Sequence, residues 1–270
     1  PMLGLIIAFK DYSPANGIFA SQWVGFKYFT QFFSSFQFGT TMFNTLKISL
    51  YSIVVGFPLP IILAIISNQL RVGKFRKIFQ VTTYLPHFIS TMVMCGMIIL
   101  FLSPTSGLLA NVFKSVGITI PDFLSKPTSF AGVYVWSDVW QHIGWDSIIY
   151  LAALSAIDPT YYEAATMDGA SRLQKIRHIE LPLLLPTAMI LLILRAGSLL
   201  SVGFEKVLLL QNPLNLAGSE IISTYVYKVG MVNFQYSYST AIGLFNTVVN
   251  LIILLSVNWF SKRYTRTGLF

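Results

Sequence analysis

Long stretches without charge constrain this chain most. No Lys, Arg, Asp or Glu occurs between Ile48 and Ile66, and none occurs between Ile78 and Phe113. A helix needs about 20 mostly apolar residues to cross the hydrocarbon core of a bilayer. Charged residues are only 10% of the 270 residues, whereas soluble domains contain about 25%. The pattern predicts an all-α fold, a polytopic membrane protein that forms a single transmembrane domain over residues 1–270.

Six spans are predicted from the apolar segments. They are placed at 1–9, 44–68, 86–103, 131–156, 183–203 and 240–261. The chain starts at Pro1 inside an apolar run, so we expect segment 1–9 to be the end of a truncated first span. Pro58 and Pro60 predict a kink in the second span, because proline removes a backbone donor and a packed bundle can accommodate the change.

The basic residues predict the orientation of the chain in the membrane. Lys and Arg are concentrated in a short loop at 71–77, in segment 158–182 and in the C-terminal tail, whereas the other connections carry scattered lysines. Cytoplasmic loops are enriched in Lys and Arg. We therefore expect these three segments, and both termini, to be cytoplasmic. The formal net charge is +8, but the basic residues form no compact face, so no nucleic-acid partner is expected.

Segment 158–182 is unusual because it is charged and lies between two apolar runs. So many charges cannot lie in hydrocarbon without a large energetic penalty. Asp158 followed by Pro159 is typical of a helix start, since Asp caps free amides and Pro fits the first helical position. Gly169 can adopt a positive φ and end that helix. The segment is therefore predicted to be a cytoplasmic hairpin of two helices.

The second helix of the 158–182 hairpin is expected to start at Ser171, because Ser171 and Gln174 match a capping box. We expect it to end before Pro182, since the residue before proline disfavours the α region. The first helix is acidic, with small residues that let another surface approach its backbone. Two interpretations follow from these residues: an element that docks a partner protein, or an amphipathic helix on the membrane surface.

One motif in this segment resembles a known family. Glu163-Ala164-Ala165, Gly169, Ile179 and Leu181-Pro182 match the EAA-type signature of permease subunits from binding-protein-dependent ABC importers. The segments "NTLKIS", "LPHFIS" and "ISTYVYKVG" also resemble oligosaccharide and polysaccharide permeases of the maltose-transporter class. The resemblance covers essentially the whole chain, and it is strongest to the polysaccharide branch that includes alginate importers.

The resemblance implies a six-span permease core in the bacterial cytoplasmic (inner) membrane. Such permeases work in a hetero-oligomer with a second homologous permease, two ATPase subunits and an extracytoplasmic substrate-binding protein. The 158–182 hairpin would carry the coupling helix, and Glu163 would pair with a basic residue of the ATPase. The implied ATPase-docking residues are Glu163, Ala164, Ala165, Asp168, Gly169, Ala170 and Pro182. The expected function is import of an oligo- or polysaccharide, with an acidic, alginate-like polymer as one candidate, by alternating access.

The chain itself is not expected to be an enzyme. A P-loop needs Gly, four residues, Gly-Lys and then Ser or Thr. Gly73-Lys74 is the chain's single Gly-Lys pair, with Asn68 and Phe75 where Gly and a hydroxyl residue are required. No catalytic residue and no cofactor are therefore predicted in this chain, and ATP and Mg would be bound by the partner ATPase. The three histidines lack the spacing of a metal site.

Ionisable residues inside a membrane span are candidates for function. Arg195 is predicted midway along the fifth span, where it could bind a carboxylate of the cargo in bidentate fashion. Alternatively it forms a structural pair with an acidic side chain of the protein. The acidic candidates for that pair are Asp138, Asp146 and Glu205. The substrate-path candidates are Arg195, Asp138, Asp146, Trp140 and Asn246.

Asp138, His142 and Asp146 interrupt the fourth span at spacings of four residues. Residues four apart share one face of a helix. We expect these three residues to face a wet cavity or to cap the span at the membrane interface. Their shared face also suggests an alternative function, an ion-coupled secondary transporter that uses them. Such a transporter needs no cytoplasmic docking helix, so the 158–182 hairpin favours the ATP-driven importer.

Overall fold

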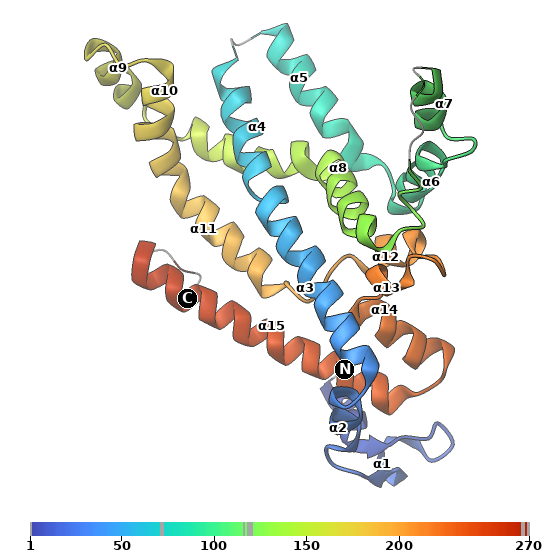
Figure 1. Cartoon of the computed structure of the whole chain (residues 1–270). Coiled ribbons are helices and arrows are strands. Elements are labelled where there is room, and N and C mark those ends of the chain that lie inside the picture. Colours follow the sequence, from blue (N-terminus) through green and yellow to red (C-terminus); the bar gives the residue numbers. More distant parts are fainter. Residues whose placement is uncertain (1, 71–72, 116, 118–120, 266–267, 269–270) are drawn as a thin grey trace. The chain divides into compact units, whose positions relative to one another are not determined.

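The computed structural model describes residues 2–70, 73–115, 117, 121–265 and 268. Most of this part of the chain is helical, and it contains only two strands of two residues each (Figure 1), which confirms the all-α fold class. Pro1, Arg71 and Arg266, which contributed to the predicted first span and orientation, lie outside the described residues.

The N-terminal segment, predicted to be the end of a truncated first span, is a short helix. Met2–Phe9 (η1) is a 3₁₀-helix of eight residues, about 16 Å long at a rise of about 2 Å per residue, against a hydrocarbon core of about 30 Å. Two short antiparallel strands follow, β1 (Lys10–Asp11) and β2 (Gln22–Trp23), with α1 (Gly17–Ala20) between them. The described part of segment 1–9 is therefore too short to cross a bilayer by itself.

The second predicted span is present and longer than predicted. After α2 (Lys27–Phe33), α3 (Phe36–Gly56) and α4 (Pro58–Gln69) form one apolar helix of 34 residues. It starts before the predicted boundary at 44. The break expected from the prolines lies at Phe57, directly before Pro58 at the first position of α4, where its missing N–H removes no helical hydrogen bond.

The region of the third predicted span contains a break between two helical segments. α5 (Lys74–Tyr84) and the 3₁₀-turn η2 (Leu85–Phe88) precede α6 (Thr91–Leu102), and the chain bends by 97° between the two helical segments. The predicted basic loop at 71–77 is wrong for its last four residues, which form the first turn of α5. Lys and Arg have high helix propensity, so their charge marks a surface position and not a loop.

The remaining elements follow in chain order. They are α7 (Leu108–Ser115), α8 (Pro127–Ser155), α9 (Pro159–Met167), α10 (Arg172–Lys175), the π-helix η3 (Ile176–Glu180), α11 (Leu181–Gly197), α12 (Phe204–Leu210), α13 (Leu216–Ser219), α14 (Ile222–Tyr227), the π-helix η4 (Lys228–Val232) and α15 (Tyr236–Thr265). α11 ends before the predicted boundary at 203, so Arg195 lies in its last turn and not midway along the span.

Among the described residues, three helices are long and apolar enough to cross a membrane. They are Phe36–Gln69, Arg172–Gly197 and Tyr236–Arg263, and the bent pair of α5–η2 with α6 brings the number to four if it is one broken span. α8 is not among them, although it has 29 residues. The arrangement with six passes therefore stays a prediction.

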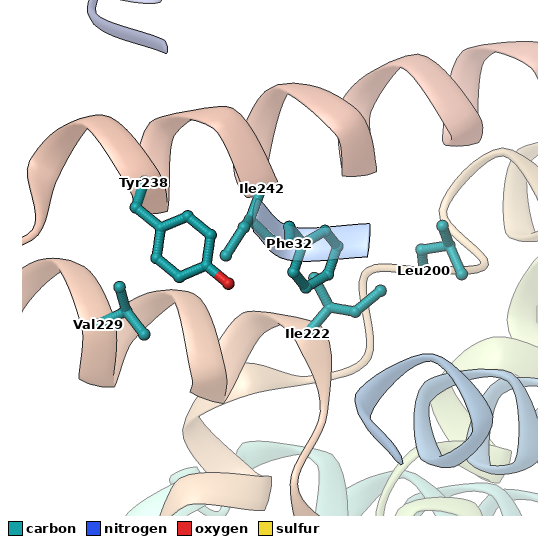
Figure 2. Packing of buried hydrophobic residues seen from close by; sticks show 6 residues of the cluster. All are labelled: Phe32, Leu200, Ile222, Val229, Tyr238 and Ile242. Carbon is teal, nitrogen blue, oxygen red and sulfur yellow. The ribbon is translucent and has the colours of Figure 1, made fainter. Parts of the chain in front are cut away.

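The chain divides into two compact units, and the first consists of Pro1–Leu50, Thr91–Tyr134 and Gly197–Ile253. Its core is a cluster of buried side chains that come from α2, α14, η4, α15 and the segment after α11. They are Phe32, Leu200, Ile222, Val229, Tyr238 and Ile242 (Figure 2). Packing of these large apolar side chains against one another joins segments that are far apart in sequence.

The second unit consists of Tyr51–Ser90, Val135–Ala196 and Leu254–Phe270. Its core joins α4, α8 and α11 through Ala64, Tyr150, Leu154, Leu184 and Ala188. Small residues let helices approach closely, as is common in membrane bundles. Two helices approach closely at Gly144, where a Cβ atom would lie 2.0 Å from the carbonyl oxygen of Thr83. α8 therefore touches the end of α5 backbone to backbone.

Candidate functional site

The first helix of the 158–182 hairpin starts where the sequence predicted. The Asp158 carboxylate accepts a hydrogen bond of 2.9 Å from the backbone N–H of Thr160, and Pro159 occupies the first turn of α9. This hydrogen bond favours the ionised form and holds the pKa of Asp158 below its ordinary value. The start of α9 is thus fixed by one side chain and one proline, both local features of the sequence.

The turn of the hairpin is a glycine turn, as predicted. Gly169 has φ of +72°, in the left-handed region. Its N–H donates to the carbonyl of Thr166 at 3.0 Å, and the N–H of Ala170 donates to the carbonyl of Ala165 at 2.8 Å. These two bonds form a Schellman motif, which satisfies carbonyls at the helix end. The chain direction after α9 therefore depends on Gly169.

The second helix starts with the predicted capping box. The N–H of Gln174 donates to Ser171 Oγ, and the N–H of Ser171 donates to Gln174 Oε1. Lys175 Nζ also donates to Thr166 Oγ1 at 2.8 Å. Because Thr166 lies in α9, this bond ties the two arms of the hairpin together.

The predicted end of the second helix before Pro182 is wrong. The helix continues through η3 into α11 and reaches Gly197 without interruption. In η3 the turn is wider than in an α-helix, and the N–H of Leu181 donates to the carbonyl of Ile176, five residues back. Proline lacks an N–H and crowds the carbonyl four residues before it, so the π-turn just ahead of Pro182 accommodates both effects.

The hairpin exposes apolar side chains among its charges. Met167 is 88% exposed and Leu173 is 74% exposed, although neither lies in an apolar run. Glu163, Ala164 and Asp168 are also exposed. Ala165 and Ala170 are partly buried, and Pro182 is exposed where the helix leaves the hairpin. The surface is a short helix with small and apolar residues beside two carboxylates.

Glu180 is the residue of this region that the sequence interpretation missed. Its side chain is fully buried. Oε1 accepts hydrogen bonds from Gln69 Nε2 at 2.8 Å, Asn68 Nδ2 at 3.2 Å and the Tyr162 hydroxyl at 3.3 Å. Oε2 is buried and has no hydrogen-bond partner among the described residues. The available signal was a Glu placed directly before the apolar run that starts at Leu181.

The predicted intramembrane residues form two polar pairs in the second unit. Arg195 Nη2 lies 2.9 Å from Asp146 Oδ2, and both side chains are about one-third exposed. Asp146 is one of the three acidic partners that the sequence suggested for Arg195. On α8, His142 Nδ1 lies 3.4 Å from Asp138 Oδ1. Within the described part of the chain, no group of three or more His, Cys, Asp or Glu could hold a metal ion.

Aromatic rings extend this polar region. His87, in the turn η2, stacks on Trp145 with ring centroids 4.4 Å apart and planes at 2°. The His87 ring is also 5.3 Å from that of His142. Gln141 Nε2 donates to the carbonyl of Ile89 at 2.8 Å, so α8 satisfies a backbone group freed by the break between η2 and α6. The sequence interpretation did not assign His87 to this region.

The other two substrate-path candidates are Trp140 and Asn246. Trp140 is 49% exposed on α8. Asn246, on α15 in the first unit, has a buried Oδ1 atom without a hydrogen-bond partner among the described residues. Asn250, one turn further along α15, accepts from the N–H of Leu200 at 2.9 Å and donates to Ser201 Oγ at 3.1 Å. Asn250 thus links α15 to the segment after α11.

Residues 56–266 match the family described as "Binding-protein-dependent transport system inner membrane component". The chain belongs to this family. It is therefore a membrane permease component, and the family resemblance seen in the sequence is confirmed. The match includes the whole 158–182 hairpin and the polar pairs of α8 and α11.

Individual relatives agree with this assignment. The permease is 40% identical to "Protein LplB" of Bacillus subtilis (strain 168), over 100% of this chain and 85% of that protein. It is also 40% identical to the "Polygalacturonan/rhamnogalacturonan transport system permease protein YteP" of the same organism, over 100% and 84%.

A solved structure is similar over the whole length. It is a crystal structure of a bacterial alginate ABC transporter in complex with an alginate pentasaccharide-bound periplasmic protein. One of its chains superimposes with a TM-score of 0.92 and is 42% identical, over 100% of this permease and 90% of that chain. The fold of the permease is thus that of an ABC importer subunit.

Proposed function

We propose that this permease moves an oligo- or polysaccharide across the bacterial cytoplasmic membrane in an ATP-driven importer. The 158–182 hairpin carries the proposal, because it presents exposed Met167 and Leu173 beside Glu163 in a segment that is too charged to lie in hydrocarbon. Exposed apolar groups and a carboxylate on a short helix outside the hydrocarbon are suited to contact with a partner protein. The partner is an ATPase subunit, and Glu163 pairs with a basic residue of it.

The proposed complex has several components. It contains a second homologous permease, two ATPase subunits and an extracytoplasmic substrate-binding protein, and both termini of this chain lie in the cytoplasm. ATP and Mg are bound by the ATPase subunits, because this chain has no P-loop motif. The chain itself holds no cofactor in this proposal.

The proposed mechanism is alternating access. Closure of the ATPase dimer on ATP displaces the hairpin, and the hairpin displaces the helices joined to it. The hairpin is suited to this because its start, its turn and its second helix are each fixed by hydrogen bonds. ATP and cargo can shift the balance between the inward-facing and outward-facing states only if each binds the two states with different affinity.

The cargo is proposed from the relatives and from the charge of the path. Alginate, described as an acidic polysaccharide, and polygalacturonan appear in the descriptions of similar proteins. Arg195 is the cation that could bind a carboxylate of such a polymer, but its charge is offset by Asp146. We therefore propose Arg195, Asp146, Asp138, Trp140 and Asn246 as the residues to test for contact with cargo.

Co-purification tests the proposed function. The permease is produced with its operon partners, and the ATPase that remains bound is measured for Glu163→Lys and for Glu205→Lys. Glu205 is an exposed acidic residue in α12, so this control makes the same charge change away from the hairpin. We expect at least a tenfold loss of bound ATPase for Glu163→Lys and none for Glu205→Lys. Retention of the ATPase by Glu163→Lys, or transport by the purified permease alone on an ion gradient, refutes the proposal.

A further inference from the structure

We infer that Glu180 is a positioning residue that joins the 158–182 hairpin to the end of α4, so that the hairpin, the end of α4 and the start of α11 move as one body. The inference rests on the proposed function, in which the hairpin receives a displacement from an ATPase. It concerns the next step, the path by which that displacement reaches the spans.

The geometry of Glu180 supports the inference directly. Three donors converge on one oxygen, Oε1, from two segments that are far apart in sequence. Asn68 and Gln69 lie at the end of α4, and Tyr162 lies in α9. Glu180 itself is the last residue of η3, directly before α11. One carboxylate thus joins its own element, η3, to two others, α4 and α9.

In the described part of the chain, the side-chain contacts that join the hairpin to α4 gather at Glu180 and Tyr162, because the Asn68 side chain also interacts with Tyr162. The remaining side-chain bonds of the hairpin are internal to it: Asp158 to Thr160, Ser171 to Gln174 and Lys175 to Thr166 among them. They make the hairpin rigid but do not join it to another helix. The bonds from Asn68 and Gln69 to Glu180 reach α4.

The burial of Glu180 makes this connection stiff. A buried polar group that loses its hydrogen-bond partner is costly, and three donors share this one acceptor. Tyr162 remains a donor over the physiological range, because burial and the nearby charge of Glu180 raise its pKa to about 12. Sliding of α9 against α4 would leave these donors and the acceptor unpaired, so the elements move together.

The unpartnered Oε2 atom predicts which substitution preserves the connection. In Glu180→Gln the amide oxygen can occupy the place of Oε1 and accept all three hydrogen bonds. The NH₂ group then occupies the place of Oε2, where no described hydrogen bond is lost. Glu180→Met has similar length but no strong acceptor. The two variants therefore separate acceptance of hydrogen bonds from the filling of space.

Distance measurements between spin labels test the inference. Labels are placed at Met167→Cys and Ile66→Cys, both exposed positions, in the intact transporter carrying Cys95→Ser. We expect a narrow distance distribution with Glu180 and with Glu180→Gln, and a distribution at least twice as wide with Glu180→Met. Tyr162→Phe removes one donor only and is expected to widen it by a smaller amount. This variant keeps the test decisive should Glu180→Met not assemble.

The result is separable from the test of the proposed function. Bound ATPase reports whether the hairpin docks, whereas the label distances report whether the hairpin and α4 form one body. We expect the complex with Glu180→Met to keep its ATPase subunits. The stimulation of its ATP hydrolysis by the binding protein should be at least fivefold smaller than in the parent complex. Unchanged label distances in both Glu180→Met and Tyr162→Phe overturn the inference. Equal broadening in Glu180→Gln and Glu180→Met also overturns it.

Discussion

The guanidinium of Arg195 in α11 donates a hydrogen bond of 2.9 Å to the carboxylate of Asp146 in α8. Each side chain is about one-third exposed. The pair brings opposite charges together at positions where an isolated charge in or near the membrane would be costly. It also reduces the capacity of Arg195 to bind an anionic cargo while the pair is intact.

Neutralising one member of this pair should lower the stability of the permease more than neutralising both. We expect Arg195→Gln and Asp146→Asn each to destabilise the permease, and the double variant to recover part of the loss. Coupling energies between contacting charges are about 0.5–3 kcal/mol, because removal of one member takes this counter-charge away from the other. Thermal unfolding of the four proteins in detergent measures the coupling. Strictly additive effects would show that the pair contributes nothing.

The contact between α8 and α5 predicts a severe effect of one added methyl group. At Gly144 a Cβ atom would lie 2.0 Å from the carbonyl oxygen of Thr83, so Gly144→Ala must displace one helix. Overpacking of this kind costs about 1–3 kcal/mol. Gly132→Ala is the matched control in the same helix, where a Cβ atom would meet nothing within 4 Å. Thermal stability should fall for Gly144→Ala only, and equal stability of the two variants would contradict the observed packing.

At the glycine turn, a side chain is predicted to destabilise the hairpin through the backbone conformation alone, without a steric clash. Gly169 has φ of +72°, and a Cβ atom there would meet nothing within 4 Å. Gly169→Ala should therefore destabilise the hairpin by about 1 kcal/mol, the cost of the left-handed region for a residue with a side chain, and Gly169→Asn by less. Gly243→Ala in α15 is the control, with open space and no positive φ. Protease sensitivity at the turn measures the effect, and a Gly169→Ala hairpin as resistant as the parent would exclude it.

The cap of α9 predicts a dependence on pH. The hydrogen bond from Thr160 lowers the pKa of Asp158 in the folded protein, while the unfolded value is about 3.9. The stabilisation by Asp158 is therefore present above about pH 4 and is lost as the pH falls through the lower, folded-state pKa. Asp158→Asn keeps an acceptor that does not titrate. Amide exchange at Thr160 and Tyr161, relative to Asp158→Asn, should accelerate below pH 4, and a constant ratio would contradict the prediction.

The hairpin could be predicted from the sequence because each of its parts is local. Asp158, Gly169 and Ser171 act on amides and carbonyls within five residues of themselves, and such caps depend on residue type and spacing alone. The exception is Pro182. Its effect on the helix depends on the π-turn before it, and no rule of spacing distinguishes that turn from a helix end.

The polar contacts could be predicted only in part. The spacing of Asp138 and His142 on α8 predicted a shared face, whereas the choice of Asp146 for Arg195 among three acids required the crossing of α8 and α11. Glu180 was missed altogether, because its donors come from α4 and α9. From the sequence alone, a carboxylate directly before an apolar run is expected to be an exposed residue at the end of a span. Its burial becomes visible only when the helices that cover it are known.

The sequence by itself determined that this protein is helical and embedded in a membrane, that its charged segment is a capped hairpin, and which family signature that hairpin carries. These properties follow from composition, from apolar length and from hydrogen bonds between near neighbours. Only the tertiary structure decided that α5 and α6 meet at a bend of 97°, that α8 touches Thr83 at Gly144, and that Glu180 holds α4, α9 and α11 together. Each of these depends on how distant helices cross, and helix crossings are fixed by side-chain packing over the whole unit.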